Sequence, residues 1–299
     1  MARILVTGAS GFIGSALADK LYELGHEVIV TGASNERKCK HSYFLPPNCR
    51  GLSNFKTIDY CFHQAAHNDT TDIDEKYMFS VNCQFSLEVF KQVAELGCKK
   101  IIYASSASVY GLNPPPHKEN DETNPANVYS QSKDFLESIA LKFSAEKNIP
   151  VIGLRYFNVY GIGEKHKQKR ASMIYQLCKQ AIQFSKVKVF KYGEQTRDWI
   201  AVEDVVDLNI SCLEHNKSDV FNAGTGIGTS INTIIDTIKE NLGKPLEVEY
   251  LENPYKSFFQ DHTKACMQKT KELLHFQPKI NIKTGVQDLL EKMKKASNI

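Results

Sequence analysis

The glycine-rich stretch from Thr7 to Gly14, TGASGFIG, constrains the fold of this chain more than any other feature. A short apolar run from Arg3 to Thr7 leads into it, and a helical pattern from Ser15 to Leu24 follows. A second apolar run covers His26 to Thr31. A strand, a glycine turn, a helix and a strand within about thirty residues predict the first unit of a dinucleotide-binding fold.

Each glycine of this stretch is expected to have a structural role that a larger residue could not fill. Gly8 permits a tight turn, Gly11 lets the backbone approach a pyrophosphate, and Gly14 lets the helix pack closely on the strand. The start of the helix offers N–H groups and the positive end of its dipole to phosphates. We therefore expect a nicotinamide dinucleotide to contact Gly8, Gly11, Phe12, Ile13 and Gly14.

The end of the second strand bears on the choice between NAD and NADP. A site that prefers NAD usually carries an acidic residue there for the ribose hydroxyls, and Gly32 stands near that position. Side chains that can bind a ribose 2′-phosphate follow it. These are Ser34, Asn35, Arg37 and Lys38. The pattern favours NADP over NAD, and a solvated loop is the alternative interpretation.

The rest of the chain alternates strand-like and helical patterns. Apolar runs recur at 58–62, 99–104, 150–154 and 187–190, and helical patterns lie at 77–96, 128–143 and 171–184. This alternation predicts an α/β fold, with a Rossmann-type, doubly wound parallel sheet and a smaller α/β substrate-binding domain. We place the NAD(P)-binding domain at 1–160 and the mainly substrate-binding domain at 161–299. The two are interleaved, because a strand near 199–222 is expected to return to the main sheet.

Tyr129 and Lys133 lie four residues apart in a helical pattern, so their side chains point the same way. A phenol is a poor base near neutral pH. A neighbouring cation lowers its pKa, and the ring charge of an oxidised nicotinamide would add to the effect of Lys133. Ser106 follows the 99–104 strand, at the kind of strand end where ligands bind in open sheets. These residues predict an oxidoreductase triad: Tyr129 is the base, Lys133 lowers its pKa and holds ribose, and Ser106 positions the reacting oxygen.

Two further positions concern the cofactor. Ala65 and Ala66 follow the 58–62 strand, and their small side chains would let the cofactor lie close to the backbone. Asn82 interrupts the apolar face of the helical pattern at 77–96.

These motifs resemble a known family. The glycine spacing, three and three, resembles that of the short-chain dehydrogenases/reductases, and Gly11 to Gly14 is similar to their extended branch. The segment Arg155 to Gly161, RYFNVYG, is typical of members that act on nucleotide sugars. The Glu-x-His-Lys that begins at Glu164, with Ala-Ser-Met at 171–173, most resembles the ADP-L-glycero-D-manno-heptose 6-epimerases. The resemblance covers nearly the whole chain.

The resemblance implies epimerisation of a nucleotide-activated sugar, by transient oxidation to a keto sugar and return of the hydride to the other face. If the cofactor stays in place, inversion needs a proton donor on each face, and Lys167 matches the second catalytic base of the family. A solvated loop lysine is the alternative interpretation of Lys167. Asn82 would pin a neighbouring strand and the cofactor loop, and Val159 would also contact the cofactor. The implied substrate-binding residues are Ser106, Asn158, Lys169, Gln176, Phe190, Arg197 and Tyr255. Lys169 and Gln176 depart from the family, which has Ser and His there. For Arg197 the alternative is a buried ion pair with Asp198 or Asp204.

Other activities stay open at this point. The triad alone would suffice for a UDP-hexose 4-epimerase, or for a nucleotide-sugar dehydrogenase or reductase. A sugar-nucleotide 4,6-dehydratase is disfavoured, because that family has Thr-Asp-Glu where this chain has Ser106-Ala107-Ser108. A non-catalytic NADP-sensing protein is only a remote alternative. Such proteins tend to lose the Tyr/Lys pair, and this chain keeps it.

Composition excludes several classes of partner. The 299 residues carry a net charge of only +3, with no basic stripe, so we expect no nucleic acid to bind. No apolar stretch is long enough to span a membrane, and the start of the chain lacks a signal-peptide pattern. The eight cysteines form no Cys-x-x-Cys pair and no metal-binding cluster with histidine, which predicts reduced thiols, no metal and a cytoplasmic location. The resemblance implies a homo-oligomer, a dimer or larger.

Overall fold

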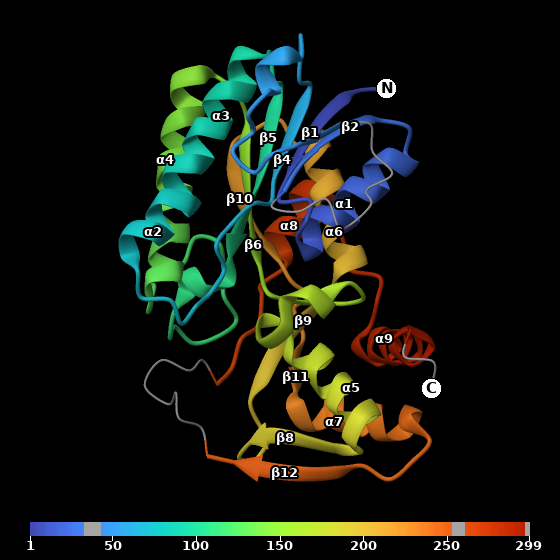
Figure 1. The fold of residues 1–299 in the computed structure, drawn as a ribbon. Coiled ribbons are helices and arrows are strands. Elements are labelled where there is room, and N and C mark those ends of the chain that lie inside the picture. The colour runs from blue at the N-terminus through green and yellow to red at the C-terminus, as the bar shows by residue number, and fades with distance from the viewer. Residues whose placement is uncertain (33–42, 253–260, 297–299) are drawn as a thin grey trace.

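The computed structural model describes residues 1–32, 43–252 and 261–296. A parallel sheet of seven strands forms the upper part of the molecule in Figure 1, in the order β10-β6-β5-β4-β1-β2-β3. Its members are β1 (Arg3–Thr7), β2 (Glu27–Thr31), β3 (Tyr43–Leu45), β4 (Tyr60–His63), β5 (Lys100–Ser106), β6 (Val151–Tyr156) and β10 (Asp219–Ala223). This sheet, with helices on both faces, confirms the predicted fold class.

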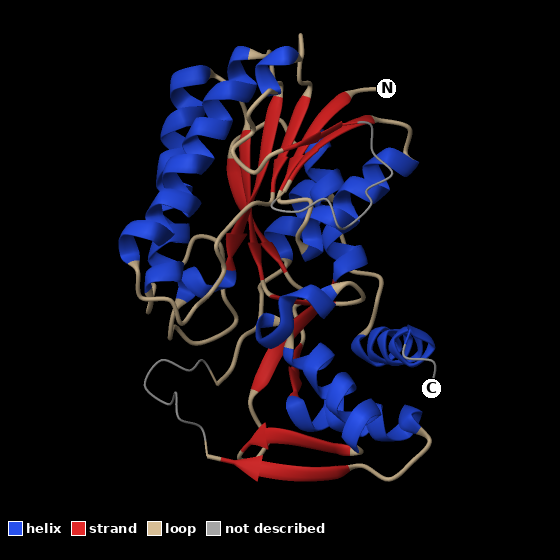
Figure 2. Cartoon of the chain, in the orientation of Figure 1, coloured by secondary structure: helices blue, strands red, loops and turns tan. Residues whose placement is uncertain are grey.

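The two faces of the sheet are covered by different helices (Figure 2). One face packs against α1 (Phe12–Glu23), α6 (Val202–Ser211) and α8 (Gln268–Leu274), and the other against α3 (Phe85–Glu95) and α4 (Val128–Lys147). Because the central strands are buried on both sides, they read as continuous apolar runs rather than as alternating patterns.

The strand order places the site. The chain runs outward from β1 to β2 and β3, then crosses to β4 on the other side of β1. Ligands of open α/β sheets bind beyond the carboxyl ends of the strands at such a switch point. The glycine turn follows β1, Ala65 and Ala66 follow β4, and Ser106 ends β5, so all three lie at this edge.

The lower part of Figure 1 holds two smaller sheets and the helices that cover them. A three-stranded sheet contains β7 (Asn158–Tyr160), β9 (Thr196–Ala201) and β11 (Gly228–Ser230), and β8 (Lys186–Phe190) pairs with β12 (Glu247–Leu251). The helices are α5 (Met173–Phe184), α7 (Ile231–Leu242) and α9 (Ile282–Ala296). They enclose a separate apolar core that includes Ile174, Trp199 and Ile234. The chain returns from this part to the large sheet at β10 and α8.

Short helical turns complete the description. They are η1 (Leu52–Asn54), η3 (Ala107–Tyr110), η4 (Glu164–Arg170) and η5 (Cys212–Glu214). The pattern at 77–96, predicted as one helix, is α2 (Glu75–Phe79), a π-helical turn η2 (Ser80–Gln84) and α3. The fully buried Asn82 lies in this wider turn. Single π-helical turns inside α-helices occur frequently at functional sites.

The residues that the structure describes contain neither a membrane-spanning helix nor a disulfide bond. None of their helices is long and apolar enough to cross a membrane. The seven cysteines among them all carry free thiols, and six of those are buried. Burial raises the pKa of several of these thiols, that of Cys83 to about 11, so they are poor nucleophiles.

Candidate active site

A cavity of about 800 Å³ lies at the carboxyl edge of the large sheet. The glycine turn lines one end, and Ser106, Tyr129 and Lys133 line another part of the wall. Side chains of η4 complete it from the smaller part of the molecule. Its volume is within the range of sites for cofactors and small ligands.

The glycine turn has the geometry that a bound pyrophosphate requires. Gly8 has a φ of +67°, and a Cβ on it would lie 2.7–2.8 Å from the backbone of Gln64 and Ala65. A Cβ on Gly14 would lie 2.4 Å from the carbonyl oxygen of Gly8. Helix α1 starts directly after this turn, and its N-cap residue is Gly11, which has no side chain to cap the first N–H groups. These residues fit a dinucleotide phosphate, with the helix dipole directed at it.

There is no room for a carboxylate side chain at position 32, where a site that prefers NAD usually carries one. Thr31 and Gly32 line the cavity here, but a Cβ on Gly32 would lie 2.7–2.8 Å from the side chain and backbone nitrogen of Ser10. Sequence analysis found the acidic residue missing, and the structure shows that Ser10 fills its space. The candidate 2′-phosphate ligands Ser34, Asn35, Arg37 and Lys38 lie outside the described residues.

A buried hydrogen-bond chain supports the cofactor side of the cavity. Ser86 donates to the carbonyl oxygen of Asn82, so the Nε2–H of His63 donates to Ser86 Oγ at 2.8 Å. Nδ1 of His63 then accepts from the Thr7 hydroxyl at 2.9 Å, and Thr7 accepts from the Ala65 N–H at 3.1 Å. This chain joins β1 to the loop after β4. Burial lowers the pKa of His63 to about 3 and keeps the imidazole neutral.

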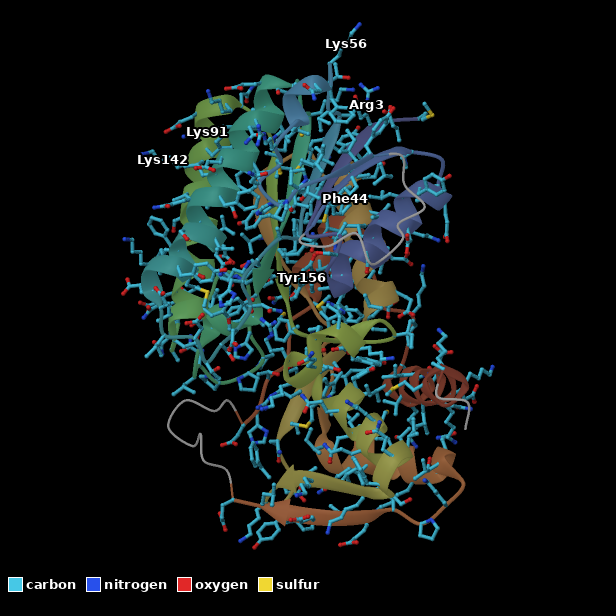
Figure 3. All side chains as sticks on the ribbon, viewed as in Figure 1. Arg3, Phe44, Lys56, Lys91, Lys142 and Tyr156 are labelled. Carbon is cyan, nitrogen blue, oxygen red and sulfur yellow. The ribbon has the colours of Figure 1, made fainter. Side chains whose placement is uncertain are left out.

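A second network holds Gln64, which also lines the cavity. The Tyr156 hydroxyl lies 2.9 Å from Gln64 Oε1, and the Gln64 amide donates to Asn209 Oδ1 at 3.1 Å. Tyr156 is at the end of the large sheet that faces the smaller part of the molecule (Figure 3). Sequence analysis singled out none of these three residues. Tyr156 stands two positions before the predicted Asn158, but Asn209 gives no local signal, because it lies on a helix far along the chain.

Asn82 acts from behind the cavity wall. Its Oδ1 accepts from the His67 N–H at 2.8 Å, and its Nδ2 donates to the His67 carbonyl at 2.9 Å and to Ser132 Oγ at 2.9 Å. Ser132 lies between Tyr129 and Lys133, so Asn82 joins the loop after β4 to the helix that carries the triad. It is not among the residues that line the cavity.

The structure brings Ser106, Tyr129 and Lys133 to one wall. Asn127 caps α4 and forms a reciprocal capping box with Ser130, which fixes the first turn beside Tyr129. The Lys133 ammonium lies 5.9 Å from the centre of the Tyr129 ring and donates to the Ala104 carbonyl at 2.8 Å. Burial lowers the pKa of Lys133 to about 8.

The predicted lowering of the Tyr129 pKa combines Lys133 with the charge of an oxidised nicotinamide, and Lys133 alone does not produce it. In the structure this pKa is raised, because burial disfavours the phenolate, while a hydrogen bond with Ser106 acts the other way. The cost of removing the phenol from water outweighs the hydrogen bond that favours the phenolate. Tyr129 therefore becomes a base only with further positive charge beside it.

Behind Ser106, a buried ion pair fixes the end of β5. Arg155 and Glu137 form two hydrogen bonds, of 3.0 and 2.7 Å, and Ser105 donates to the same carboxylate at 2.5 Å. The Arg155 guanidinium also lies 4.8 Å from the centre of the Tyr110 ring. The arginine of the RYFNVYG motif, Arg155, thus holds the structure behind the cavity in place.

Lys167 reaches the cavity from η4. Its ammonium lies 3.4 Å from Glu164 and 5.3 Å from the centre of the Phe12 ring. His166 and Arg170, which sequence analysis did not single out, line the same cavity. The stretch was expected to be a charged loop, and its 3₁₀ geometry turns these side chains toward the cofactor turn.

The other predicted cofactor contacts line the cavity as well, and most of the predicted substrate residues do not. Val159 and the alanines 65 and 66 belong to the first group. Asn158 donates its amide to the Asp198 carbonyl at 3.2 Å, and Gln176 donates to the carbonyls of Lys169 and Ala171. Lys169 is exposed, Phe190 ends β8, and Tyr255 lies outside the described residues.

Arg197 lies on β9, away from the cavity wall. It donates to the carbonyl oxygens of Thr196 and Asp261, and burial lowers its pKa to about 10. The expected alternative partners are engaged elsewhere: Asp198 accepts from Thr225, Gly226 and Ala265, and Asp204 accepts from the N–H groups of 279 and 280.

No group of histidine, cysteine, aspartate or glutamate suited to a metal ion occurs in the described part of the chain. Tyr129 and Lys167 line one cavity with the glycine turn, an arrangement that is chemically suited to proton transfer next to a dinucleotide.

Comparison with known proteins agrees with this geometry. ADP-L-glycero-D-manno-heptose-6-epimerase of Brachyspira hyodysenteriae is 34% identical over 317 residues, which cover 98% of each chain. The crystal structure of the Helicobacter pylori ADP-L-glycero-D-manno-heptose-6-epimerase has a TM-score of 0.89 and 35% identity, covering 98% of this chain and 96% of that one. UDP-glucose 4-epimerase of Thermotoga maritima, solved with UDP-glucose, has a TM-score of 0.88 and 28% identity over 99% of each chain. Residues 4–224 match the NAD dependent epimerase/dehydratase family, and the chain belongs to it.

Proposed function

We propose that this protein is an ADP-L-glycero-D-manno-heptose 6-epimerase. The observation that carries the proposal is that two side chains capable of proton transfer, Tyr129 on α4 and Lys167 on η4, line one cavity with the glycine turn. In the proposed mechanism one such group serves each orientation of the keto sugar. The similarity to two heptose epimerases supports the choice of sugar.

The residues divide the reaction into two halves. A nicotinamide dinucleotide held by the glycine turn would supply hydride transfer to and from the sugar carbon and, in its oxidised form, positive charge beside Tyr129. In the first half, Tyr129 Oη accepts the hydroxyl proton while Ser106 orients the oxygen, and a carbonyl forms. After the keto sugar turns over, Lys167 donates a proton to the carbonyl oxygen as the hydride returns to the other face. Tyr129 then loses its proton and Lys167 regains one, which restores the enzyme.

We propose NADP as the cofactor. Support comes from Gly32, where contact with Ser10 leaves no room for the carboxylate that selects an unphosphorylated ribose. Mass spectrometry of the dinucleotide that copurifies with the protein tests this. NADP is expected, and NAD as the main species would overturn the proposal.

The test of the activity is incubation of the purified protein with ADP-D-glycero-D-manno-heptose, UDP-glucose and a GDP-hexose in deuterated buffer. NMR is expected to show inversion at C6 of the heptose, with no deuterium on that carbon, because the hydride never exchanges with solvent. Inversion of UDP-glucose alone would instead establish a UDP-hexose 4-epimerase, for which the triad suffices. Reduction of added cofactor with no inversion would establish a dehydrogenase.

Three further expectations belong to this proposal. The division near residue 160 gives each domain one ligand, the dinucleotide or the sugar. A homo-oligomer, a dimer or larger, is tested by light scattering. A cytoplasmic location agrees with the free thiols of the described residues.

A further inference from the structure

Glu164 is a charged side chain that the reaction does not use directly. Its side chain is fully buried, and it does not line the cavity. Taking a carboxylate out of water is costly, so such a group is kept only where its oxygens are well satisfied. Its surroundings therefore indicate what it does.

The four contacts of Glu164 all lie within one short segment. Oε1 accepts from the Gly161 N–H at 3.2 Å and from the Ser172 hydroxyl at 2.7 Å. Oε2 accepts from the Ser172 N–H at 2.5 Å and faces the Lys167 ammonium at 3.4 Å. One carboxylate thus joins the start of the segment, its end and the ammonium between them.

The backbone of the same segment has an irregular conformation that these hydrogen bonds would stabilise. Gly163 has a φ of +104°, and Gln168 interrupts η4 with a φ of +48°. Left-handed backbone at a residue other than glycine is unfavourable and persists only where its surroundings enforce it. Ser172 also caps α5 by accepting from the Tyr175 N–H, so Glu164 ties the segment to a rigid helix.

The contact on the other side of Lys167 completes the arrangement. The Lys167 ammonium lies between the Glu164 carboxylate and the Phe12 ring, and Phe12 begins α1 beside the glycine turn. A cation is attracted both to a carboxylate and to the face of a ring. Two fixed partners thus restrict a side chain that otherwise has four rotatable bonds, and only 19% of that side chain is exposed.

We propose that Glu164 is a positioning residue of the epimerisation. It holds the Lys167 ammonium at the cavity wall, in reach of the carbonyl oxygen of the turned-over keto sugar, and it acts only through Lys167. This inference rests on the proposed function, because Lys167 needs accurate placement only if it donates a proton during inversion.

The kinetic test compares Glu164→Gln, Lys167→Met and the double variant on ADP-D-glycero-D-manno-heptose. Misplacing a reacting group by about 1 Å can cost on the order of a hundredfold in rate. We expect Glu164→Gln to lower kcat about tenfold to a hundredfold and to leave KM within about threefold. In the Lys167→Met background the same change is expected to cost nothing further. An unchanged kcat, or an equal loss in both backgrounds, would overturn the proposal.

Two controls separate positioning from folding. Ser230→Ala removes the cap of α7 in the same way that damage near Ser172 would weaken α5, and it is expected to lower Tm without lowering kcat. Glu164→Asp keeps the charge but shortens the reach, so it tests the same point should the amide variant not fold. It is expected to lower kcat, and again only while Lys167 is present.

A readout without substrate separates this inference from the proposed function. Lysines can be methylated with ¹³C-formaldehyde and observed by NMR, and the Lys167 signal is assigned by its loss in Lys167→Met. Glu164→Gln is expected to shift that signal and to leave that of the exposed Lys142 in place. A shift in a protein that epimerises no sugar would keep the contact and refute the function. An unshifted Lys167 signal would refute the contact.

Discussion

The Lys133 ammonium donates a hydrogen bond of 2.8 Å to the carbonyl oxygen of Ala104, one strand position away from the serines that end β5. This bond ties the helix of the triad to the strand that carries Ser106. It also explains why a lysine is tolerated with only 2% of its surface exposed. The buried charge nevertheless has a cost, which the lowered pKa of about 8 expresses.

Lys133→Met is expected to separate activity from stability. Between pH 8 and 10.5 the unfolded chain holds a proton on this residue that the folded protein has lost, so burial of the charge works against folding below that range. At pH 7 the variant should have a Tm no lower than wild type, while kcat falls by at least about a hundredfold. Thermal unfolding and the sugar assay measure the two effects, with the exposed Lys142→Met on the same helix as the control. A large drop in Tm would show that Lys133 is mainly structural.

Gly32 offers a test of cofactor choice. Gly32→Ala places a Cβ against Ser10, and because overpacking of this kind costs about 1–3 kcal/mol, the free energy of unfolding should fall by that amount. Gly228→Ala is the matched control, since its nearest neighbours lie at 3.4 Å or more. Gly32→Asp should weaken binding of NAD and of NADP, as measured by calorimetry. Tighter NAD binding would mean that a carboxylate fits at this position after all.

The buried His63 predicts a stability that depends on pH. Its pKa is about 3 in the folded protein against an ordinary 6.5, so between these values the unfolded chain binds one more proton. The free energy of unfolding should therefore fall as the pH falls through this window, by up to about 1.4 kcal/mol for each pH unit from this residue. The free energy of unfolding is measured by urea unfolding at pH 6.5, 6 and 5. Its decrease with falling pH should be smaller in His63→Gln than in wild type, and equal to that of wild type in the exposed His262→Gln. Equal decreases in wild type and His63→Gln would contradict the assignment.

The large sheet was predictable from sequence because its signals are local. Each buried strand is a continuous apolar run. Glycine at positions 8 and 14 indicates a tight turn and close backbone packing. That Ser106, Tyr129 and Lys133 line one cavity was predictable for a related reason, because the ends of parallel strands meet at one edge. Tyr129 and Ser106 then need only lie near such ends to reach the same cavity.

The parts that sequence analysis missed depend on contacts between distant segments. Asn209 supports Gln64 across 145 positions of the chain, and no spacing rule connects them. The raised pKa of Tyr129 depends on burial, which the spacing to Lys133 does not report. Glu164 was part of a motif, but its role follows from being fully buried, which a charged stretch does not suggest. The π-helical turn at Asn82 likewise results from partners at His67 and Ser132.

Replacing Tyr129 and replacing Lys167 should block different halves of the proposed reaction. Tyr129→Phe removes the base of the first half-reaction, so it should lower epimerisation of any accepted sugar nucleotide by about a hundredfold to ten-thousandfold. Lys167→Met should abolish inversion of ADP-D-glycero-D-manno-heptose to a similar extent, yet still allow the first oxidation. Rapid mixing with the heptose should therefore show reduced nicotinamide by absorbance in Lys167→Met and none in Tyr129→Phe. Inversion at the wild-type rate in Lys167→Met would remove Lys167 from the mechanism and leave a site in which Tyr129 serves both faces, as a 4-epimerase would need.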